Sequence, residues 1–189
     1  MDTGEHIQHL PVAVVMRHEP VQGAMARWQS HRWVLDEVVP DQPAFGTQPQ
    51  RLREADGSTY WLHPGLVAEL HPEDAEGYYL NITTDQPCWF VMWRLDDDGQ
   101  GPARPMAVSL SYHDAGRWLD AQETVDQVPL PPALVQTLRD YVATHHRPEV
   151  KRRQRPQSFQ PLRDRFGNPA SVSTDKGRRG GGAAGGGGA

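Results

Sequence analysis

The sequence predicts an α+β fold that is mainly β: an antiparallel meander of seven to eight strands, as a curled sheet or small barrel, followed by two C-terminal helices. Three observations lead to this fold class. Apolar runs of strand length recur between residues 11 and 112, clusters of Gly, Pro and Asp separate them, and helical periodicity is confined to residues 115–147. We expect the last helix to pack on the sheet.

The first strands are predicted from β-branched runs. Residues 11–17 are almost continuously apolar, which is typical of a strand that is covered on both faces. Residues 33–39 predict a second strand after a linker or short helix. The loop at residues 40–49, with three prolines and one glycine, separates this strand from the next.

Two turn signals predict hairpins in the middle of the chain. Asp56-Gly57 is typical of a two-residue hairpin turn. Pro64-Gly65 predicts a second turn, which leads into a strand at residues 66–70, because proline presets φ and glycine supplies a positive φ.

Three more strands are expected at residues 78–83, 88–95 and 106–112, and apolar side chains alternate in the last two. Residues 81–83 (Asn-Ile-Thr) match a glycosylation acceptor, but we discard it because it falls inside a predicted strand of a chain with no export signal.

Two helices complete the expected domain. Asp114 is a suitable N-cap for a helix at residues 115–122. Pro131-Pro132 begins a second helix with a one-sided apolar stripe, and Pro148 ends it.

The chain is expected to form one globular domain at residues 10–147, between a disordered N-terminus (residues 1–9) and a disordered, basic, glycine-rich tail (residues 148–189). Charge divides at the same boundary. Residues 1–147 carry ten basic and twenty-one acidic residues, a net charge of -11, whereas the tail carries nine basic and three acidic residues, +6. The acidic body repels polyanions and the tail attracts them.

A cytoplasmic protein without a membrane segment is expected. The longest apolar run, residues 12–16, is far below the ~20 residues that span a bilayer, and the polar start does not match a secretory signal. Cys88 is the one cysteine, so an intrachain disulfide and a thiolate-rich zinc site are excluded, and we expect it to be buried in a strand.

No motif indicates a catalytic residue or a cofactor. Phosphate-binding loops, Gly-x-Ser-x-Gly and His-Glu-x-x-His are absent from the sequence. The nine histidines lack partners at metal-ligand spacing: His145 and His146 point about 100° apart on a helix, and only His63 and His71 could face each other, at the base of the expected hairpin. We therefore expect no metal site.

The densest cluster of aromatic and polar residues gives the candidate binding site. The favoured interpretation is that Trp28 and Trp33 both pack in the core. Alternatively, one of them forms a partner-binding surface with His31 and Arg32, because Trp and Arg are favoured anchors at interfaces. Arg17 joins the candidates as a cationic group that a pocket in this region would use.

The tail supplies a second candidate. Lys151, Arg152, Arg153 and Arg155 could contact a polyanion or a partner protein. The run has few interleaved aromatic residues and follows an acidic body, so a solubilising tail or a protein contact is favoured over nucleic acid.

Several segments together resemble a bacterial family of domains of unknown function, number 3305, over residues 10–155. They are residues 11–17, Trp28-Gln29 with Trp33, residues 76–81, 90–94 and 121–132, and the helix that ends at His145-His146 before a basic run. Members of this family are typically encoded beside molybdenum-dependent formate dehydrogenases and their maturation factors. The resemblance implies a cytoplasmic accessory role and supplies no catalytic residue.

The leading hypothesis is therefore a non-catalytic accessory protein that assists maturation or assembly of a molybdenum-dependent formate dehydrogenase, with a dehydrogenase subunit or a maturation factor as its protein partner. An enzyme that acts on the molybdenum cofactor or a related small molecule is one alternative. A nucleic-acid-binding regulator that uses the basic tail is the other.

Overall fold

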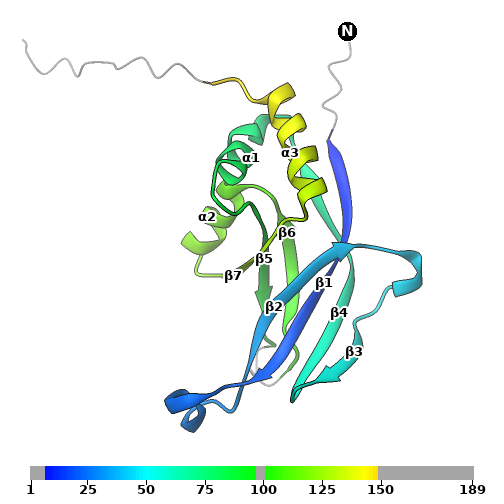
Figure 1. The fold of residues 1–189 in the computed structure, drawn as a ribbon, viewed down its shortest axis with the longest axis vertical. Helices are drawn as coiled ribbons and strands as arrows, with labels where there is room; N and C mark the ends of the chain where they lie inside the picture. Colours follow the sequence, from blue (N-terminus) through cyan, green and yellow to red (C-terminus); the bar gives the residue numbers. More distant parts are fainter. Residues whose placement is uncertain (1–6, 97–100, 149–189) are drawn as a thin grey trace, which may run out of the picture. The chain divides into compact units, whose positions relative to one another are not determined.

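The computed structural model describes residues 7–96 and 101–148, which contain seven strands in two antiparallel sheets and three α-helices (Figure 1). The first sheet has the order β2-β1-β4-β3 and consists of β1 (Gln8–Pro20), β2 (His31–Pro40), β3 (Gln50–Ala55) and β4 (Ser58–Leu70). The fold is mainly β, as predicted. It is not one meander, however, and the sheets of the described residues do not close into a barrel.

β1 is covered on both faces, which confirms the prediction from its β-branched run. Val12, Val14 and Met16 belong to the main core, whereas Ala13 and Val15 belong to a second apolar cluster on the opposite face. The strand begins two residues before the expected start of the domain, because its first residues pair with the end of β4.

Pro64-Gly65 forms a β-bulge instead of the predicted turn. Val12 pairs with Leu66 and Val14 pairs with His63, so two residues of β4 lie opposite one residue of β1. Gly65 has the positive φ (83°) that was expected, but β4 continues through it to Leu70. Its backbone N–H donates to Asp41 Oδ2 at 3.0 Å, which holds the bulge in place.

The hairpin at Asp56-Gly57 is confirmed. Both residues have a positive φ, 52° and 75°, as a tight turn between β3 and β4 requires. Glycine adopts this conformation without strain, and aspartate tolerates it better than most residues.

The second sheet has the order β6-β5-β7 and consists of β5 (Cys88–Arg94), β6 (Arg104–Ser109) and β7 (Thr124–Pro129). The alternation in β5 is confirmed, since Trp89, Val91 and Trp93 all face the main core. The sequence did not predict β7, whose six residues include only two apolar residues other than proline.

Asp126 of β7 connects the two sheets. Its Oδ2 accepts hydrogen bonds from Trp93 Nε1 (2.9 Å) and from the backbone N–H of Leu35 on β2 (3.4 Å). The carboxylate therefore satisfies a core tryptophan and an amide of β2 at once.

A helix, α1 (Ala75–Ile82), replaces the strand predicted at residues 78–83. It follows a 3-10 turn, η3 (Pro72–Asp74), whose proline occupies the position typical of a helix start. Tyr78 and Asn81 lie three residues apart and are both buried, which is helical spacing.

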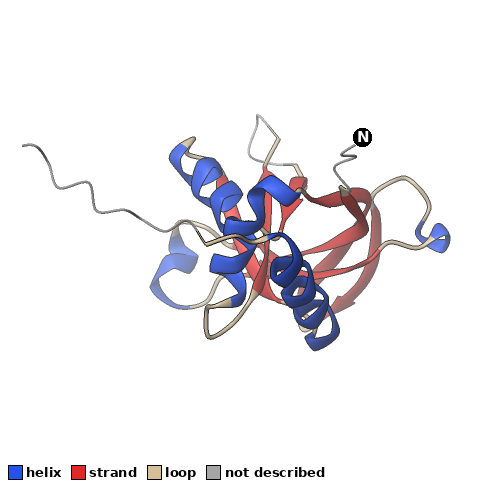
Figure 2. Cartoon of the chain, turned by 90° about the horizontal axis from the view of Figure 1, so that it is seen from above, coloured by secondary structure: helices blue, strands red, loops and turns tan. Residues whose placement is uncertain are grey.

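The remaining helices are α2 (Tyr112–Asp120) and α3 (Pro132–His145), and all three helices gather beside one end of the strands (Figure 2). The N-cap of α2 is Ser111, whereas the sequence suggested Asp114. Because the helix begins at Tyr112, the strand predicted at residues 106–112 is shorter than expected and ends at Ser109. α3 packs on the sheet as expected: Leu138, Tyr141 and Val142 are buried in the main core, and Tyr141 Oη donates to Leu70 O at 3.0 Å.

Asn81 joins α1 to both neighbouring strand ends. Its side chain is fully buried. Nδ2 donates to Cys88 O and to Leu110 O, both at 2.8 Å, and Oδ1 accepts from the Cys88 N–H at 3.0 Å. The side-chain amide thus bonds two carbonyl groups and one N–H group. Asn81 is unsuitable as a glycosylation acceptor because it is buried in a helix, and not because it lies in a strand as expected.

Replacing Asn81 with alanine is expected to lower the free energy of unfolding by about 3 kcal/mol or more, because buried groups of Cys88 and Leu110 lose their partners. Urea unfolding followed by circular dichroism measures the change. Gln86→Ala, which removes an exposed side-chain amide in the loop after the same helix, is the control and should change it by less than about 0.5 kcal/mol. Equal effects of the two substitutions would contradict the role of Asn81.

One helical glycine, Gly77, is closely packed, whereas another, Gly116, borders open space. A Cβ at Gly77 of α1 would collide with Ser111 Oγ and would lie 2.8 Å from Asp74 Oδ1. A Cβ at Gly116 of α2 would meet nothing within 4 Å. Helix α1 therefore approaches the N-cap of α2 closely only because residue 77 has no side chain.

Gly77→Ala and Gly116→Ala are expected to change stability in opposite directions. The first should lower the melting temperature because it displaces the Ser111 hydroxyl from its capping position. The second should raise stability by up to about 1 kcal/mol, since alanine is the better helix former. Thermal unfolding of both variants measures this, and a shift of the same sign for both would refute the close packing at Gly77.

Candidate functional site

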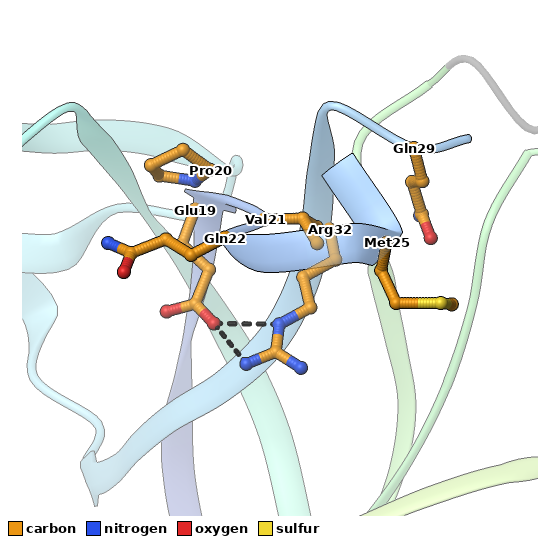
Figure 3. Close-up of a pocket in the computed structure, with 7 residues that line it drawn as sticks. All are labelled: Glu19, Pro20, Val21, Gln22, Met25, Gln29 and Arg32. Atoms are coloured by element: carbon orange, nitrogen blue, oxygen red, sulfur yellow. Dashed lines mark hydrogen bonds and ion pairs between the residues drawn. The ribbon is translucent and has the colours of Figure 1, made fainter. Parts of the chain in front are cut away.

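A cavity of about 470 Å³ lies where β1 passes into β2, and it is the strongest candidate site from its position and composition (Figure 3). We call this region, residues 19–32, the β1–β2 tip. It contains the 3-10 turn η1 (Gly23–Arg27), and Val21 N–H donates to Ser30 O at 2.9 Å to close the loop. The lining residues are Glu19, Pro20, Val21, Gln22, Met25, Gln29 and Arg32.

A chain of ion pairs forms one wall of the cavity and continues onto the sheet. Arg32 Nε and Nη2 lie 2.8 Å and 2.7 Å from Glu19 Oε1. Arg17 lies 3.0 Å from Glu19 Oε2 through Nε and 3.0 Å from Asp36 Oδ1 through Nη1. Two arginines and two carboxylates alternate, so the network carries no net charge.

A ring stack occupies the opposite face of the same strands. The ring of His18 lies 4.9 Å from that of His31 and 4.7 Å from that of Trp33. Burial lowers the pKa of His18, and the neighbouring His31 lowers it further. The neutral form of His18 is therefore favoured in the stack.

The residues predicted from sequence divide into three groups. Arg17 and Arg32 meet through Glu19, and His31 and Trp33 meet through His18 on the other face. Trp28 joins neither group.

The interpretation that both tryptophans pack in the core is wrong for Trp28. Its side chain is 87% exposed at the end of η1, and its backbone N–H donates to Met25 O at 3.0 Å. Met25 is also exposed, at 64%. Trp33 is half-buried and packs against the main core, as expected.

Sequence reasoning missed Glu19, Gln22 and Met25, which line the cavity. Gly23, whose φ is 80°, gave the available signal, because it marks a turn inside the linker. The basic candidates Lys151, Arg152, Arg153 and Arg155 lie outside the described residues, and their contacts stay predictions.

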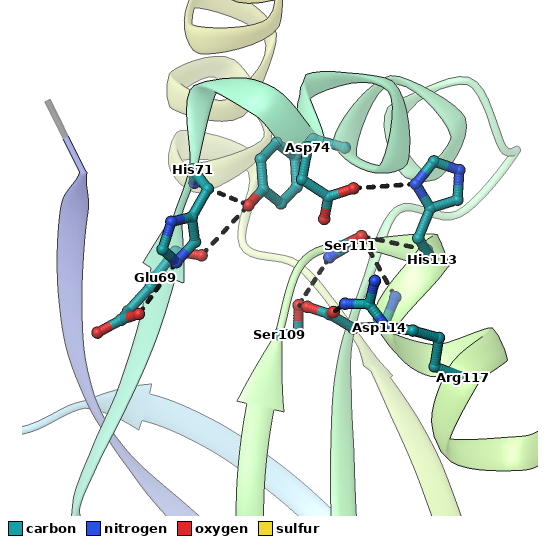
Figure 4. A network of polar contacts seen from close by, with 9 residues as sticks. Glu69, His71, Asp74, Ser109, Ser111, His113, Asp114 and Arg117 are labelled. Atoms are coloured by element: carbon teal, nitrogen blue, oxygen red, sulfur yellow. Dashed lines mark hydrogen bonds and ion pairs between the residues drawn. The ribbon is translucent and has the colours of Figure 1, made fainter. Parts of the chain in front are cut away.

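A polar network near the starts of α1 and α2 contains serine, histidine and aspartate side chains, the residue types of many hydrolase active sites (Figure 4). His113 Nδ1 lies 2.9 Å from Asp74 Oδ1, and Ser109 Oγ donates to Asp114 Oδ2 at 2.5 Å. Ser111, however, is fully buried and its Oγ accepts backbone N–H groups as an N-cap. The hydroxyl is therefore committed to the helix start, and we assign this network a structural role.

The expected facing of His63 and His71 is wrong, because both lie along the continuous β4 and its extension instead of across a hairpin. His71 Nε2 lies 3.0 Å from Glu69 Oε2, whereas His63 is buried and its Nε2 has no hydrogen-bond partner among the described residues. Among those residues, no group of three or more His, Cys, Asp or Glu side chains is placed to hold a metal ion.

Cys88 is buried in β5, as expected, and burial raises the pKa of its thiol, which disfavours the reactive thiolate. No helix in the described part of the chain is both long and apolar enough to cross a membrane.

Comparison with known proteins gives one match. A model of the family described as "Protein of unknown function (DUF3305)" matches residues 11–155, which include all three helices and both sheets described above except the first three residues of β1. None of the curated proteins and none of the solved structures matches the chain.

The buried His63 is expected to make folding sensitive to acid. Burial lowers its pKa from 6.5, and the charge of Arg104 lowers it further. The unfolded chain therefore takes up the proton at a higher pH than the folded chain does, so stability should be lost as pH falls through about 6.5. His18, whose pKa is also lowered, contributes in the same direction.

Urea unfolding at pH 7.5, 6.5 and 5.5 measures the effect, with a slope of up to about 1.4 kcal/mol per pH unit for one proton. His63→Leu should reduce the slope, whatever its effect on stability at pH 7.5. The same slope in both proteins would show that His63 is not responsible.

Proposed function

The chain belongs to the DUF3305 family, whose members are described as proteins of unknown function, and we propose that it is a non-catalytic accessory protein that binds a partner protein through the β1–β2 tip. The observation that carries this proposal is the exposure of Trp28, 87%, beside the exposed Met25. Tryptophan is the residue type most enriched at the energetic centres of protein interfaces, and methionine adapts to varied partner surfaces.

The surroundings of Trp28 also support a protein partner. The cavity beside it is mainly polar, with two glutamine side chains that can exchange hydrogen bonds with a peptide backbone. The ion pairs between Arg17, Glu19, Arg32 and Asp36 balance one another, so the wall offers no excess of positive charge to a nucleic acid. An apolar anchor within a paired polar rim is the usual anatomy of a protein interface.

The partner that we propose is a subunit of a molybdenum-dependent formate dehydrogenase or one of its maturation factors. This identity follows from what the family resemblance implies about the genes that accompany its members. The exposed tip supports binding as such and is compatible with either partner.

Trp28→Ala is expected to weaken partner binding about thirtyfold, the effect of losing an interface anchor worth about 2 kcal/mol. The full chain carries an affinity tag and is expressed in its native cell. Mass spectrometry quantifies the copurified dehydrogenase subunits and maturation factors, and metal analysis quantifies molybdenum in the eluate.

Leu119→Ala is the matched control, because Leu119 is also a large, exposed apolar residue (58%) but lies on α2, outside the tip. It should leave the copurified proteins unchanged. Equal recovery with Trp28→Ala and the unaltered chain would exclude the tip as the binding surface. Normal loading and activity of the dehydrogenase in a deletion strain would exclude the accessory role.

A further inference from the structure

A second surface lies between α3 and the first residues of β1. One face of α3, from Pro131 to His145, borders two adjoining cavities of about 460 and 320 Å³. Thr137 lines both cavities, and Gln8, Leu10 and Val12, which point to the same side of β1, line them from the strand. We call this continuous feature the α3 groove.

The end of the groove near Pro131 is apolar. Trp89, Val12 and Val38 belong to the main core and yet line this cavity, so the core opens to the surface here. Pro11, Pro40 and Pro131 have no backbone N–H to offer.

Thr137 contributes the one hydroxyl group of the apolar cavity, and this hydroxyl already donates to Ala133 O at 3.1 Å. This end of the groove therefore favours an apolar group. A leucine or phenylalanine side chain fits within its volume.

The end near His145 carries a carboxylate. Asp140 lines the second cavity, and among the described residues its carboxylate accepts one hydrogen bond, from Gln136 Nε2 at 2.9 Å. None of the ion pairs found among the described residues includes Asp140. His145 at the same end packs on the ring of Tyr141, with the ring centroids 4.4 Å apart.

Charge indicates the occupant. Residues 1–147 carry a net charge of -11, and the carboxylate of Asp140, which forms no ion pair among the described residues, attracts a cation to the polar end. Ala133 in the apolar cavity and Asp140 are about 10 Å apart along the helix, the distance that about three residues of an extended chain cover.

We propose that the α3 groove binds an extended segment of a partner protein in which a leucine- or phenylalanine-sized residue lies about three residues from a lysine or arginine. The apolar residue fills the cavity at Pro131, and the basic residue pairs with Asp140. This surface does not include the β1–β2 tip, so it stands whether or not Trp28 binds a partner.

The probe is a phage-displayed library of random twelve-residue peptides, selected on the full-length chain. Enriched peptides should share an apolar and a basic residue at that spacing. In fluorescence anisotropy, Ala133→Trp, which fills the apolar end, and Asp140→Lys should each weaken a representative peptide about tenfold or more. Trp28→Ala should leave its affinity unchanged.

Matched controls come from exposed positions outside the groove. Ala143→Trp adds the same bulk on another face of α3, and Asp120→Lys makes the same charge change on α2. Both should bind the peptide as the unaltered chain does. Thr137→Trp, at an exposed position in the middle of the groove, replaces Ala133→Trp if that variant does not fold.

Absence of enrichment would overturn the proposal, and so would peptides whose affinity is insensitive to both groove substitutions. Purely apolar peptides that tolerate Asp140→Lys would overturn the role of the carboxylate. Loss of affinity on Trp28→Ala alone would place the peptide at the tip and refute the groove.

Discussion

The burial of β1 on both faces is the constraint on which the rest of the structure depends. A strand with apolar side chains on alternate faces loses its stabilisation if either face meets water. The second sheet and α3 cover one face, with Trp89 and Leu138 in the same core as Val14. On the other face, Ala13 and Val15 lie beside Leu62 of the neighbouring β4, and Phe45 packs against this cluster. β2 and β4 pair with both edges of most of the strand, so every other element of the first sheet is placed by β1 or by a neighbour of β1.

Local patterns predicted the parts of the fold that local physics determines. The β-branched run of β1, the alternation of β5 and the proline start of α3 each fix a structure from adjacent residues, and the structure confirms all three. Pro64-Gly65 shows the limit. A positive φ at glycine serves a turn and a bulge equally well, and only the single residue of β1 opposite the pair decides between them.

Helix α1 and strand β7 were missed for related reasons. Residues 78–83 form a short, largely apolar run, in which periodicity does not separate a strand from a helix. The anchor of the helix, Asn81, acts through partners at Cys88 and Leu110. β7 has little apolar character because Asp126 points inward, where it binds Trp93 and the amide of Leu35. Long-range contacts thus override local propensity in both elements.

The candidate surfaces were only partly accessible to sequence reasoning. The aromatic and basic cluster at residues 28–33 indicated the correct segment. Alternation along β2 places Arg32 and Trp33 on opposite faces, the register with β1 pairs them with Glu19 and His18, and the position of η1 exposes Trp28. The α3 groove joins residues more than 120 positions apart, and no local pattern could have predicted it. Asp140 could not be singled out from the sequence, because it is one of twenty-one acidic residues in residues 1–147.

Both surfaces lie at ends of the same strand, and this arrangement has a consequence for binding. The α3 groove uses the first residues of β1, and the tip begins at its last residues, about 25 to 35 Å away along the strand. β1 is held by two neighbours and covered on both faces, so this separation is fixed. A partner that reaches both surfaces gains from the second contact without a further loss of translational freedom, whereas a flexible separation would dilute that gain. The buried strand that organises the core therefore also sets the distance between the two surfaces.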